Sequence, residues 1–263
     1  MKKITGNPIY SGITTVAVLI ILILSSILIN PMPAQVASAA SILSFGGFIP
    51  AQTTTANKTS AKTAKKTPPP NGIFTDKFTN PASLAANWQI VDAKVSWGGP
   101  SSWTIKNGML VQNSGIFYNG KNRFQILEGT NIISKNPEPE QFTYSVEFNT
   151  KMGKEGVGVL FHYIDEQHYY RFVTVQNAAS GGPFRMLQSK VEGNFVTLAQ
   201  NKQGYDPGKA HKVMIKVAND TITVYFDGKK QFSAPSGHDT ANGHVGLQTY
   251  ANHVGFDNLQ VTR

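Results

Sequence analysis

From about residue 73 to its end, the chain alternates apolar and polar residues in short runs. The clearest pair is 156–164, Gly-Val-Gly-Val-Leu-Phe-His-Tyr-Ile, and 168–176, His-Tyr-Tyr-Arg-Phe-Val-Thr-Val-Gln, joined by Asp165-Glu166-Gln167. Successive side chains of a strand point to opposite faces, and here both faces are largely apolar. We therefore predict a hairpin whose strands lie in the middle of a sheet.

Similar β-rich runs, separated by turn residues, fill the rest of this region at the spacing typical of a sandwich or barrel. Helical periodicity is nearly absent, and only 81–87 is expected to form a single helical turn. Turns are indicated at Glu192-Gly193 and Asn219-Asp220, and most strongly at Asp227-Gly228. The predicted strands are 73–78, 88–95, 108–112, 125–134, 141–150, 157–164, 169–176, 184–191, 195–199, 211–217, 221–226, 244–249 and 254–262.

The beginning of the chain has a different pattern. Lys2 and Lys3 precede an apolar run over 9–29, as in the basic and hydrophobic regions of an export signal. Ala37-Ser38-Ala39 offers a cleavage site, but the run is also long enough to span a bilayer, so release and retention both stay open. We predict that residues 1–39 are a signal peptide or signal anchor. The domain would then be secreted or lie at the extracellular face of the cell membrane.

Composition separates a linker from a single folded domain. Residues 40–71 are rich in Thr, Ala, Lys and Pro, which predicts a disordered linker before a domain at 72–263. The net charge of +9 arises mainly before the domain, since the chain from residue 71 onward holds 18 basic residues against all 15 acids. This balance is not typical of nucleic-acid binding. The absence of cysteine excludes disulfides, thiolate metal sites and a Cys nucleophile.

Several sequence blocks resemble a known family. They are Phe74-Thr-Asp-Lys-Phe78 with Trp88, Trp103–Val111, Gly156–Phe172, His211–Val217, Asp220–Gly228, Gly243–Tyr250 and Val254–Val261. The domain resembles the concanavalin A-like or laminin G-like jelly roll and, within it, the 3-keto-disaccharide hydrolase and related family 16-like domains. The resemblance implies an all-β, two-sheet antiparallel jelly-roll sandwich. It implies no single activity, because lectin-like modules, glycosidases, lyases and adhesion domains share this scaffold.

The catalytic patterns of these relatives are missing from the sequence. A retaining glucanase needs two nearby carboxylates, which the related enzymes carry as Glu-x-Asp-x-x-Glu on one strand. No predicted strand has that pattern, and the Gln-x-His of the related lyases does not occur. Glu138 and Glu140 flank Pro139 in a loop-like segment, and Asp165-Glu166 lies at a turn. We predict no catalytic residue, and whether the domain is an enzyme stays open.

Compared with catalysis, carbohydrate binding requires fewer specialised residues, and the sequence contains residues of the required types. Sugars are held by aromatic faces and by planar polar side chains that hydrogen-bond to hydroxyl groups. We predict a module that binds extracellular glycan or polysaccharide. The alternatives are a hydrolase or lyase of the 3-keto-disaccharide hydrolase type acting on a modified sugar, and a structural cell-envelope domain. The predicted ligand-binding residues are Trp103, His162, Arg171, Arg185, Gln248 and Tyr250.

Two of these residues and two acids have competing interpretations. His162 is either a base or ligand donor or a packed histidine, and Arg171 either binds an anionic group or bridges strands. The resemblance also implies a structural Ca²⁺ where the first and last strands meet. Asp76 and Asp257 occupy those positions, and hard oxygen ligands suit this ion, although both acids are equally compatible with turns or strand edges.

Overall fold

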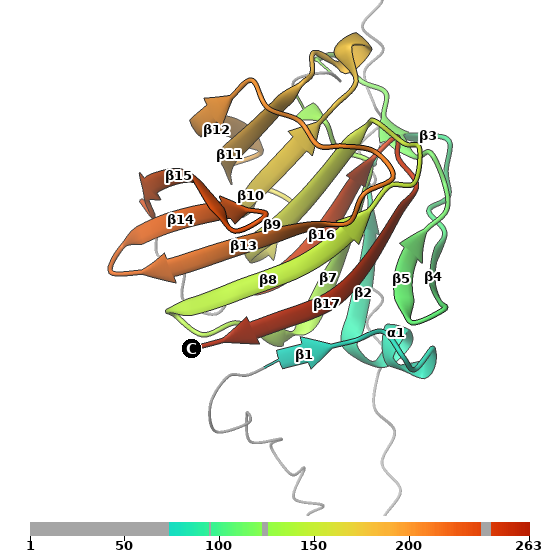
Figure 1. The fold of residues 1–263 in the computed structure, drawn as a ribbon, viewed down its shortest axis with the longest axis horizontal. Helices are drawn as coiled ribbons and strands as arrows, with labels where there is room; N and C mark the ends of the chain where they lie inside the picture. The colour runs from blue at the N-terminus through green and yellow to red at the C-terminus, as the bar shows by residue number, and fades with distance from the viewer. Residues whose placement is uncertain (1–73, 95, 123–125, 238–242) are drawn as a thin grey trace, which may run out of the picture. The chain divides into compact units, whose positions relative to one another are not determined.

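The computed structural model describes residues 74–94, 96–122, 126–237 and 243–263. These residues form two antiparallel β-sheets that pack face to face (Figure 1). The predicted signal or anchor at 1–39 and the predicted linker at 40–71 lie outside the described residues. Within the described part of the chain, no helix is long and apolar enough to cross a membrane.

The first sheet has eight strands and buries one face. On β13 (His211–Ala218), Val213, Ile215 and Val217 are buried while Lys212 and Lys216 are exposed, which is the period-two pattern of a strand with one solvated face. In order across the sheet, the strands are β15 (Lys229–Pro235), β14 (Thr221–Phe226), β13, β8 (Phe142–Asn149), β17 (Val254–Thr262), β5 (Met109–Gln112) and β4 (Trp103–Lys106), and β1 (Phe74–Asp76) pairs with β17.

The second sheet has seven strands, and both faces of its centre are buried. The predicted hairpin is confirmed as β9 (Gly156–Asp165) and β10 (His168–Val175). One face packs on the first sheet, whereas the outer face is covered by the segment that carries Ile116 and Leu127. The order is β12 (Asn194–Asn201), β11 (Phe184–Val191), β10, β9, β16 (His244–Tyr250), β7 (Thr130–Pro137) and β2 (Trp88–Asp92).

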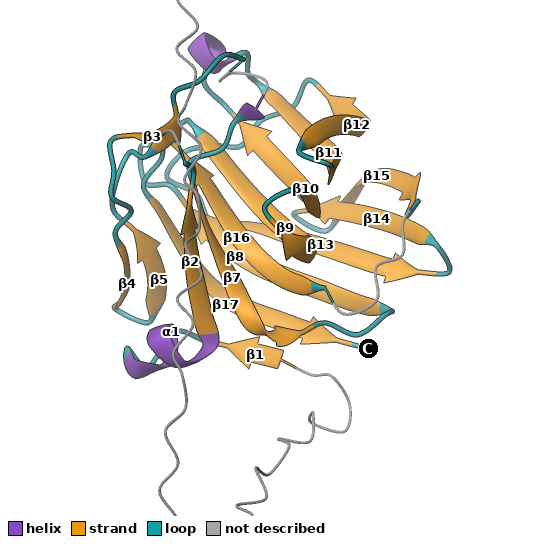
Figure 2. Ribbon diagram, turned by 180° about the vertical axis from the view of Figure 1, so that it is seen from behind, coloured by secondary structure: helices purple, strands orange, loops and turns teal. Residues whose placement is uncertain are grey.

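The remaining elements are small. Helix α1 (Ala82–Asn87) follows β1, and a 3₁₀ turn, η1, covers Ala178–Ser180. A ribbon of two short strands, β3 (Ser96–Trp97) and β6 (Phe117–Tyr118), lies beside the two sheets (Figure 2). Its place is fixed by backbone hydrogen bonds, since Tyr118 N donates to Glu128 O at 2.5 Å.

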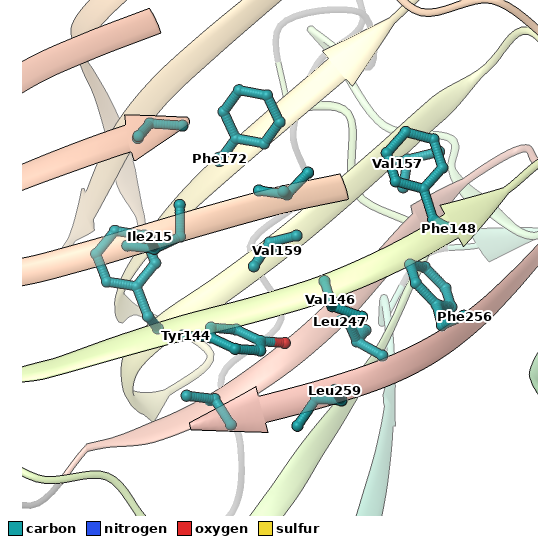
Figure 3. Close-up of a cluster of buried hydrophobic side chains, with 14 of the residues drawn as sticks. Tyr144, Val146, Phe148, Val157, Val159, Phe172, Ile215, Leu247, Phe256 and Leu259 are labelled. Atoms are coloured by element: carbon teal, nitrogen blue, oxygen red, sulfur yellow. The ribbon is translucent and has the colours of Figure 1, made fainter. Parts of the chain in front are cut away.

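The core lies between the sheets. Figure 3 shows apolar side chains of β8 and β17, such as Val146 and Phe256, beside those of β9 and β16, such as Val159 and Leu247. Tyr144 also lies in this layer, and its buried hydroxyl donates to Gly246 O on the opposite sheet at 3.0 Å. Aligned sheets of this kind bury the alternate side chains of both inner faces, which is the jelly-roll sandwich that the sequence predicted.

The predicted strands and the single helical turn all have observed counterparts, while β3, β4, β6 and β15 were not predicted. The ribbon strands are only two residues long, so they contain no alternation to detect. The turn at Asp227-Gly228 is confirmed: both residues have positive φ, 49° and 76°, as a tight two-residue hairpin turn requires.

Candidate functional site

The outer face of the seven-stranded sheet brings together three of the predicted binding residues, Arg171, Gln248 and Tyr250. Arg171 on β10 and Gln248 on β16 flank β9, where they face Leu160 and Gly158 across the two ladders. Gly158 leaves room for this contact, because a Cβ there would lie 2.9 Å from the Gln248 Cβ. The two polar side chains therefore meet over the middle strand.

Arg171 is the centre of a buried hydrogen-bond network. Its Nε donates to Gln188 Oε1 at 2.9 Å and one Nη donates to Gln248 Oε1 at 3.0 Å. The guanidinium also donates to the carbonyls of Ile126 at 2.7 Å and Leu127 at 3.4 Å. Gln248 continues the network by donating to Asn131 Oδ1 at 2.8 Å.

The position of Arg171 favours a structural role. Its side chain is 0% exposed and stacks on the Phe195 ring, with the guanidinium carbon 3.8 Å from the ring centroid. Burial lowers the pKa of this guanidinium from its ordinary value, while Tyr169 and Glu128 raise it. Because its donors are directed at protein acceptors, Arg171 fastens Ile126 and Leu127 to the sheet.

A polar groove of about 390 Å³ lies beside this network, at the edge of the covering segment. Two of its charged residues, Glu128 and Lys190, form an ion pair: their side chains are 18% and 11% exposed, and Glu128 Oε1 lies 2.6 Å from Lys190 Nζ. The same Glu128 oxygen accepts a hydrogen bond from the Tyr169 hydroxyl at 2.5 Å. The groove is lined by Val91, Asp92, Ala93, Lys94, Tyr118, Glu128, Gly129, Asn131, Glu166, Gln167, Lys190, Glu192 and Gly193.

Tyr169 and Asn131 connect the groove to the arginine network. Burial raises the pKa of the Tyr169 hydroxyl well above its ordinary value, and the neighbouring Glu128 charge acts in the same direction. The hydroxyl therefore stays protonated at neutral pH and donates to Glu128. Asn131 lines the groove while its Oδ1 accepts from Gln248. The polar groups of the groove are thus held in place before any ligand arrives, which is typical of binding sites.

The aromatic residues proposed for stacking lie in the interior. Trp103 on β4 is 5% exposed, its Nε1 donates to Thr130 at 2.9 Å and its ring stacks on Phe256. Tyr250 is also buried, in a cluster with Leu127 and Val175 under the covering segment. Neither ring offers an open face to a sugar. The exposed tryptophan is Trp97 on β3, 66% exposed. It is not among the predicted binding residues, although Gly98-Gly99-Pro100 marks a turn directly after it.

His162 lies at one end of the core, paired with Glu138. It sits at a bulge in β9, where its φ is 48°, and both side chains of the pair are 1% exposed. Its Nδ1 contacts Glu138 Oε1, and the rings of Phe142, Phe161 and Tyr170 surround the imidazole. Burial raises the pKa of Glu138 above its ordinary value, although His162 opposes the shift. The structure thus shows the packed histidine of the two interpretations, with an acid as its partner.

Arg185 belongs to a different and smaller cavity of about 230 Å³. Its guanidinium stacks on Phe226 at 3.6 Å from the ring centroid and donates to the carbonyl of Gly204 at 3.0 Å. His211 and Asp227 line the same cavity, with Nδ1 and Oδ2 separated by 2.8 Å. Sequence reasoning missed this pair because the two residues are sixteen positions apart and meet only when β13 pairs with β14.

A third hollow, of about 600 Å³, lies where β8 begins and β13 ends in the eight-stranded sheet. It is lined by Pro139–Thr143, Lys216–Ala218 and Arg263. Glu140 and Lys216 are exposed there. None of the six predicted binding residues lines this hollow, so its charged residues serve below as controls.

Asp76 and Asp257, the two acids predicted to hold calcium, each accept hydrogen bonds from nearby groups. Asp76 accepts hydrogen bonds on both oxygens, from Phe78 N at 2.7 Å and from Trp88 Nε1 at 3.0 Å. Asp257 accepts from Asn258 N at 2.6 Å. Within the described ranges, no group of three or more His, Asp or Glu side chains is placed to hold a metal ion.

Calcium binding stays a prediction of the sequence resemblance. Its test is the melting temperature of the full chain in calcium and in EDTA. An ion bound by the folded state raises the melting temperature with its concentration. Equal melting temperatures in the two buffers would contradict the prediction.

Comparison with known proteins places this architecture in a family. Residues 73–262, nearly all of the described sandwich, match the family described as the 3-keto-alpha-glucoside-1,2-lyase-like domain. The chain belongs to this family. Its fold and its two-sheet core are therefore those of a carbohydrate-related β-sandwich domain.

This member of the 3-keto-alpha-glucoside-1,2-lyase-like domain family is similar in sequence to part of one enzyme, and in fold to a binding module and a glucanase. An extracellular exo-alpha-L-arabinofuranosidase of Streptomyces chartreusis is 25% identical over 162 residues, which cover 60% of this chain but only 16% of that protein. The carbohydrate binding module CBM66 from Bacillus subtilis superposes with a TM-score of 0.51 at 17% identity, covering 67% of this chain and 95% of the module. Bacillus licheniformis beta-glucanase superposes at 0.53 with 12% identity, over 74% and 100%. At these identities the two superpositions show a shared fold alone.

Proposed function

We propose that the domain binds extracellular carbohydrate in the groove beside the Arg171 network. The observation that carries the proposal is the preorganised set of polar side chains in a groove of about 390 Å³, formed by Glu128, Lys190 and Asn131 with Tyr118 at its wall. Acceptors and donors at fixed positions suit the hydroxyl groups of a sugar, and a tyrosine ring suits its C–H face. Binding of this kind requires no catalytic acid pair.

The sequence predicted that Arg171 and Gln248 contact the ligand directly, whereas here the ligand lies in the groove next to them. Arg171 and Gln248 remain part of the site because they hold Asn131 and the covering segment in place. Residues that hold the ligand-binding side chains in place determine how accurately those side chains are positioned.

The first experiment is a binding screen of the full-length chain against neutral, acidic and amino glycans, by thermal shift and calorimetry. Arabino-oligosaccharides and β-glucans belong in the panel because the relatives are named for them. A bound glycan should raise the melting temperature. A chain that binds no member of the panel would contradict the proposal.

Lys190→Met should weaken binding of any glycan found in this screen by about tenfold, because a charged donor is lost while the side-chain length is kept. Methionine retains an apolar contact with Phe195, whose ring centroid lies 5.0 Å from Lys190 Nζ, and Glu128 keeps its hydrogen bond from Tyr169. Lys216→Met, in the hollow at the other sheet, is the matched control and should bind normally. Loss of affinity in Lys216→Met instead would place the glycan in that other hollow.

The alternative function is elimination or hydrolysis of a modified sugar in the same groove. The family description names a lyase, and such chemistry requires a base to remove a proton and an acid to protonate the leaving group. Glu128 is a carboxylate, and Tyr169 and Lys190 donate to it, so the groove contains both kinds of group. Assay of 3-keto-glucosides with Glu128→Gln, and with Glu140→Gln as control, distinguishes turnover from binding. Intact ligand after prolonged incubation would exclude this alternative.

We also propose that the domain acts outside the cell, either released or tethered by its amino-terminal segment. The apolar run after Lys2 and Lys3 supports this location, as does the extracellular arabinofuranosidase among the relatives. Digestion of intact cells by an external protease, with membrane and medium fractions probed separately, tests both exposure and tethering. A domain protected inside intact cells would contradict the proposal.

A further inference from the structure

One exposed turn of the eight-stranded sheet carries a modification motif that the proposed function does not use. Asn219, Asp220 and Thr221 form an Asn-x-Thr triplet without proline, which is the acceptor sequence for N-linked glycosylation in exported proteins. The chain contains one other triplet of this kind, Asn57-Lys58-Thr59, which lies outside the described residues. Such a triplet also occurs by chance, so the surroundings of Asn219 decide whether it can accept a sugar.

Asn219 lies at the tip of the hairpin that joins β13 to β14. Ala218 pairs with Thr221, and the two residues between them have positive φ, 49° at Asn219 and 55° at Asp220. These angles are typical of a tight two-residue hairpin turn, and asparagine adopts them more readily than most residues. The turn is also held by the neighbouring hairpin, because Ser236 N donates to Asp220 O at 2.9 Å. Asn219 is therefore exposed on a turn whose backbone is fixed.

The Asn219 carboxamide is available for reaction. Asn219 is exposed, and its carboxamide makes no hydrogen bond with the described residues. Thr221 is exposed as well, and its hydroxyl donates to the carbonyl of Asn219 at 3.2 Å. The hydroxyl that completes the motif therefore lies beside the acceptor residue, and neither group is needed for packing.

The hollow of about 600 Å³ provides space next to this turn. It reaches Ala218, the residue directly before Asn219. Its lining also includes Glu140 and Gln141, whose polar groups can hydrogen-bond to sugar hydroxyls. The proposed carbohydrate groove involves the other sheet, and none of its lining residues belongs to the turn. A glycan attached at Asn219 therefore leaves that groove open.

We infer that Asn219 is a site of N-linked glycosylation. The donor is an oligosaccharide joined through phosphate to a membrane lipid. Nδ2 of Asn219 forms a bond to the anomeric carbon of the oligosaccharide, while the bond from that carbon to the phosphate oxygen breaks. The lipid phosphate leaves, and the proton lost from Nδ2 passes to a base of the transferase. The inference rests on the proposed extracellular location and is independent of carbohydrate binding in the groove.

Mass spectrometry of the full chain, purified from the cells that produce it, tests the inference. Trypsin releases residues 217–229, a peptide in which Asn219 is the only asparagine. We expect this peptide to carry a glycan, and electron-transfer fragmentation should place the added mass on Asn219 rather than on Thr221 or Thr223. An unmodified peptide, or added mass on a threonine, would overturn the inference.

Substitutions in the triplet show whether the motif directs the modification. Thr221→Val removes the hydroxyl but keeps Asn219 and a β-branched residue in the strand, so the peptide should lose its glycan. Thr221→Ser keeps the hydroxyl and should keep the glycan, whereas Asn219→Gln should lose it. Asn57→Gln, in the other triplet, is the control and should leave peptide 217–229 modified. A glycan that persists on this peptide in Thr221→Val contradicts recognition of the triplet.

Failure of this inference is distinguishable from failure of the proposed location. Digestion of intact cells by an external protease reports the location of the domain independently of its mass. An unmodified peptide 217–229 from a chain that the protease reaches overturns glycosylation and leaves the extracellular location in place. An unmodified peptide from a chain protected inside the cells overturns both.

Discussion

Replacing Arg171 with methionine is expected to lower the free energy of unfolding by about 3 kcal/mol. The substitution leaves Gln188, Gln248 and the carbonyls of Ile126 and Leu127 without their donor in a buried place. Each buried acceptor without a partner costs roughly 1–3 kcal/mol, and the sum is reduced because a charge no longer has to be buried. Methionine keeps most of the unbranched apolar stem, so the loss reports the removal of the guanidinium with its hydrogen bonds and packing.

Urea denaturation followed by tryptophan fluorescence checks this value. Arg263→Met, which removes an exposed arginine, is the matched control and should unfold at the urea concentration of the native chain. The same two variants separate the interpretations of Arg171. A variant with native stability and no glycan binding would restore Arg171 as a direct ligand contact and contradict the structural role.

Replacing Glu138 with alanine should destabilise the domain by about 3–5 kcal/mol, because it leaves His162 buried without its partner. Both side chains are 1% exposed, and no other hydrogen bond to the imidazole nitrogens is present among the described residues. Glu140→Ala provides a nearby control, since Glu140 is exposed and its loss should have little effect. Similar urea midpoints for the two variants would show that the pair contributes nothing to stability.

The double variant Glu138→Met with His162→Leu tests whether the pair itself is required. Well-packed apolar residues often replace a buried ion pair without loss, whereas removal of one partner leaves a buried polar group unpaired. We therefore expect the double variant to recover most of the stability lost in Glu138→Ala. No recovery would show that the bulge at His162, with its φ of 48°, depends on the imidazole.

Glu138 also predicts a pH dependence. Burial raises its pKa in the folded state above the ordinary value of 4.5, with His162, Tyr144 and His244 as the titratable neighbours that interact with its charge. The unfolded chain then ionises this carboxyl more readily, so its contribution to stability is full below the unfolded pKa and is lost as pH rises through the folded pKa. Glu138→Gln removes this titration. As pH rises through the folded-state pKa of Glu138, the free energy of unfolding of the native chain should therefore fall relative to that of Glu138→Gln. Parallel plots of unfolding free energy against pH for the two proteins would show that Glu138 does not cause this dependence.

In the candidate site, the sequence predicted the strands but not the long-range contacts between their side chains. Arg171 and Gln248 each lie in a run whose alternation predicted a strand, and the two strands, β10 and β16, belong to one sheet. Their partners were not foreseen, since Leu127 and Gln248 are 44 and 77 positions from Arg171 and the covering segment has no regular period. Glu138 was read as a loop acid for the same reason. A residue's burial by a distant irregular segment leaves no local trace in the sequence.

The tryptophans likewise show that local sequence does not reveal burial. Trp97 and Trp103 both lie beside turn residues in short strands, yet one is 66% exposed and the other 5% exposed. Their surroundings differ because Trp103 lies on a strand of the eight-stranded sheet, where it donates a hydrogen bond to Thr130 and stacks on Phe256. Trp97 lies on the separate two-stranded ribbon. Amino-acid type could not distinguish a core tryptophan from a surface one.

Local spacing alone was enough to predict all the strands except β3, β4, β6 and β15, the central hairpin and the tight turn at Asp227-Gly228, because backbone period and positive φ are properties of neighbouring residues. Composition excluded cysteine chemistry, and the amino-terminal pattern predicts a signal peptide or signal anchor, which lies outside the described residues. Packing decided which face of the seven-stranded sheet is covered, that Arg171 is buried with its donors on protein acceptors, and that Asp92, Glu128 and Lys190 line one groove. Those residues come from strands and loops far apart in the chain, and only the folding of the sheets brings their charges together.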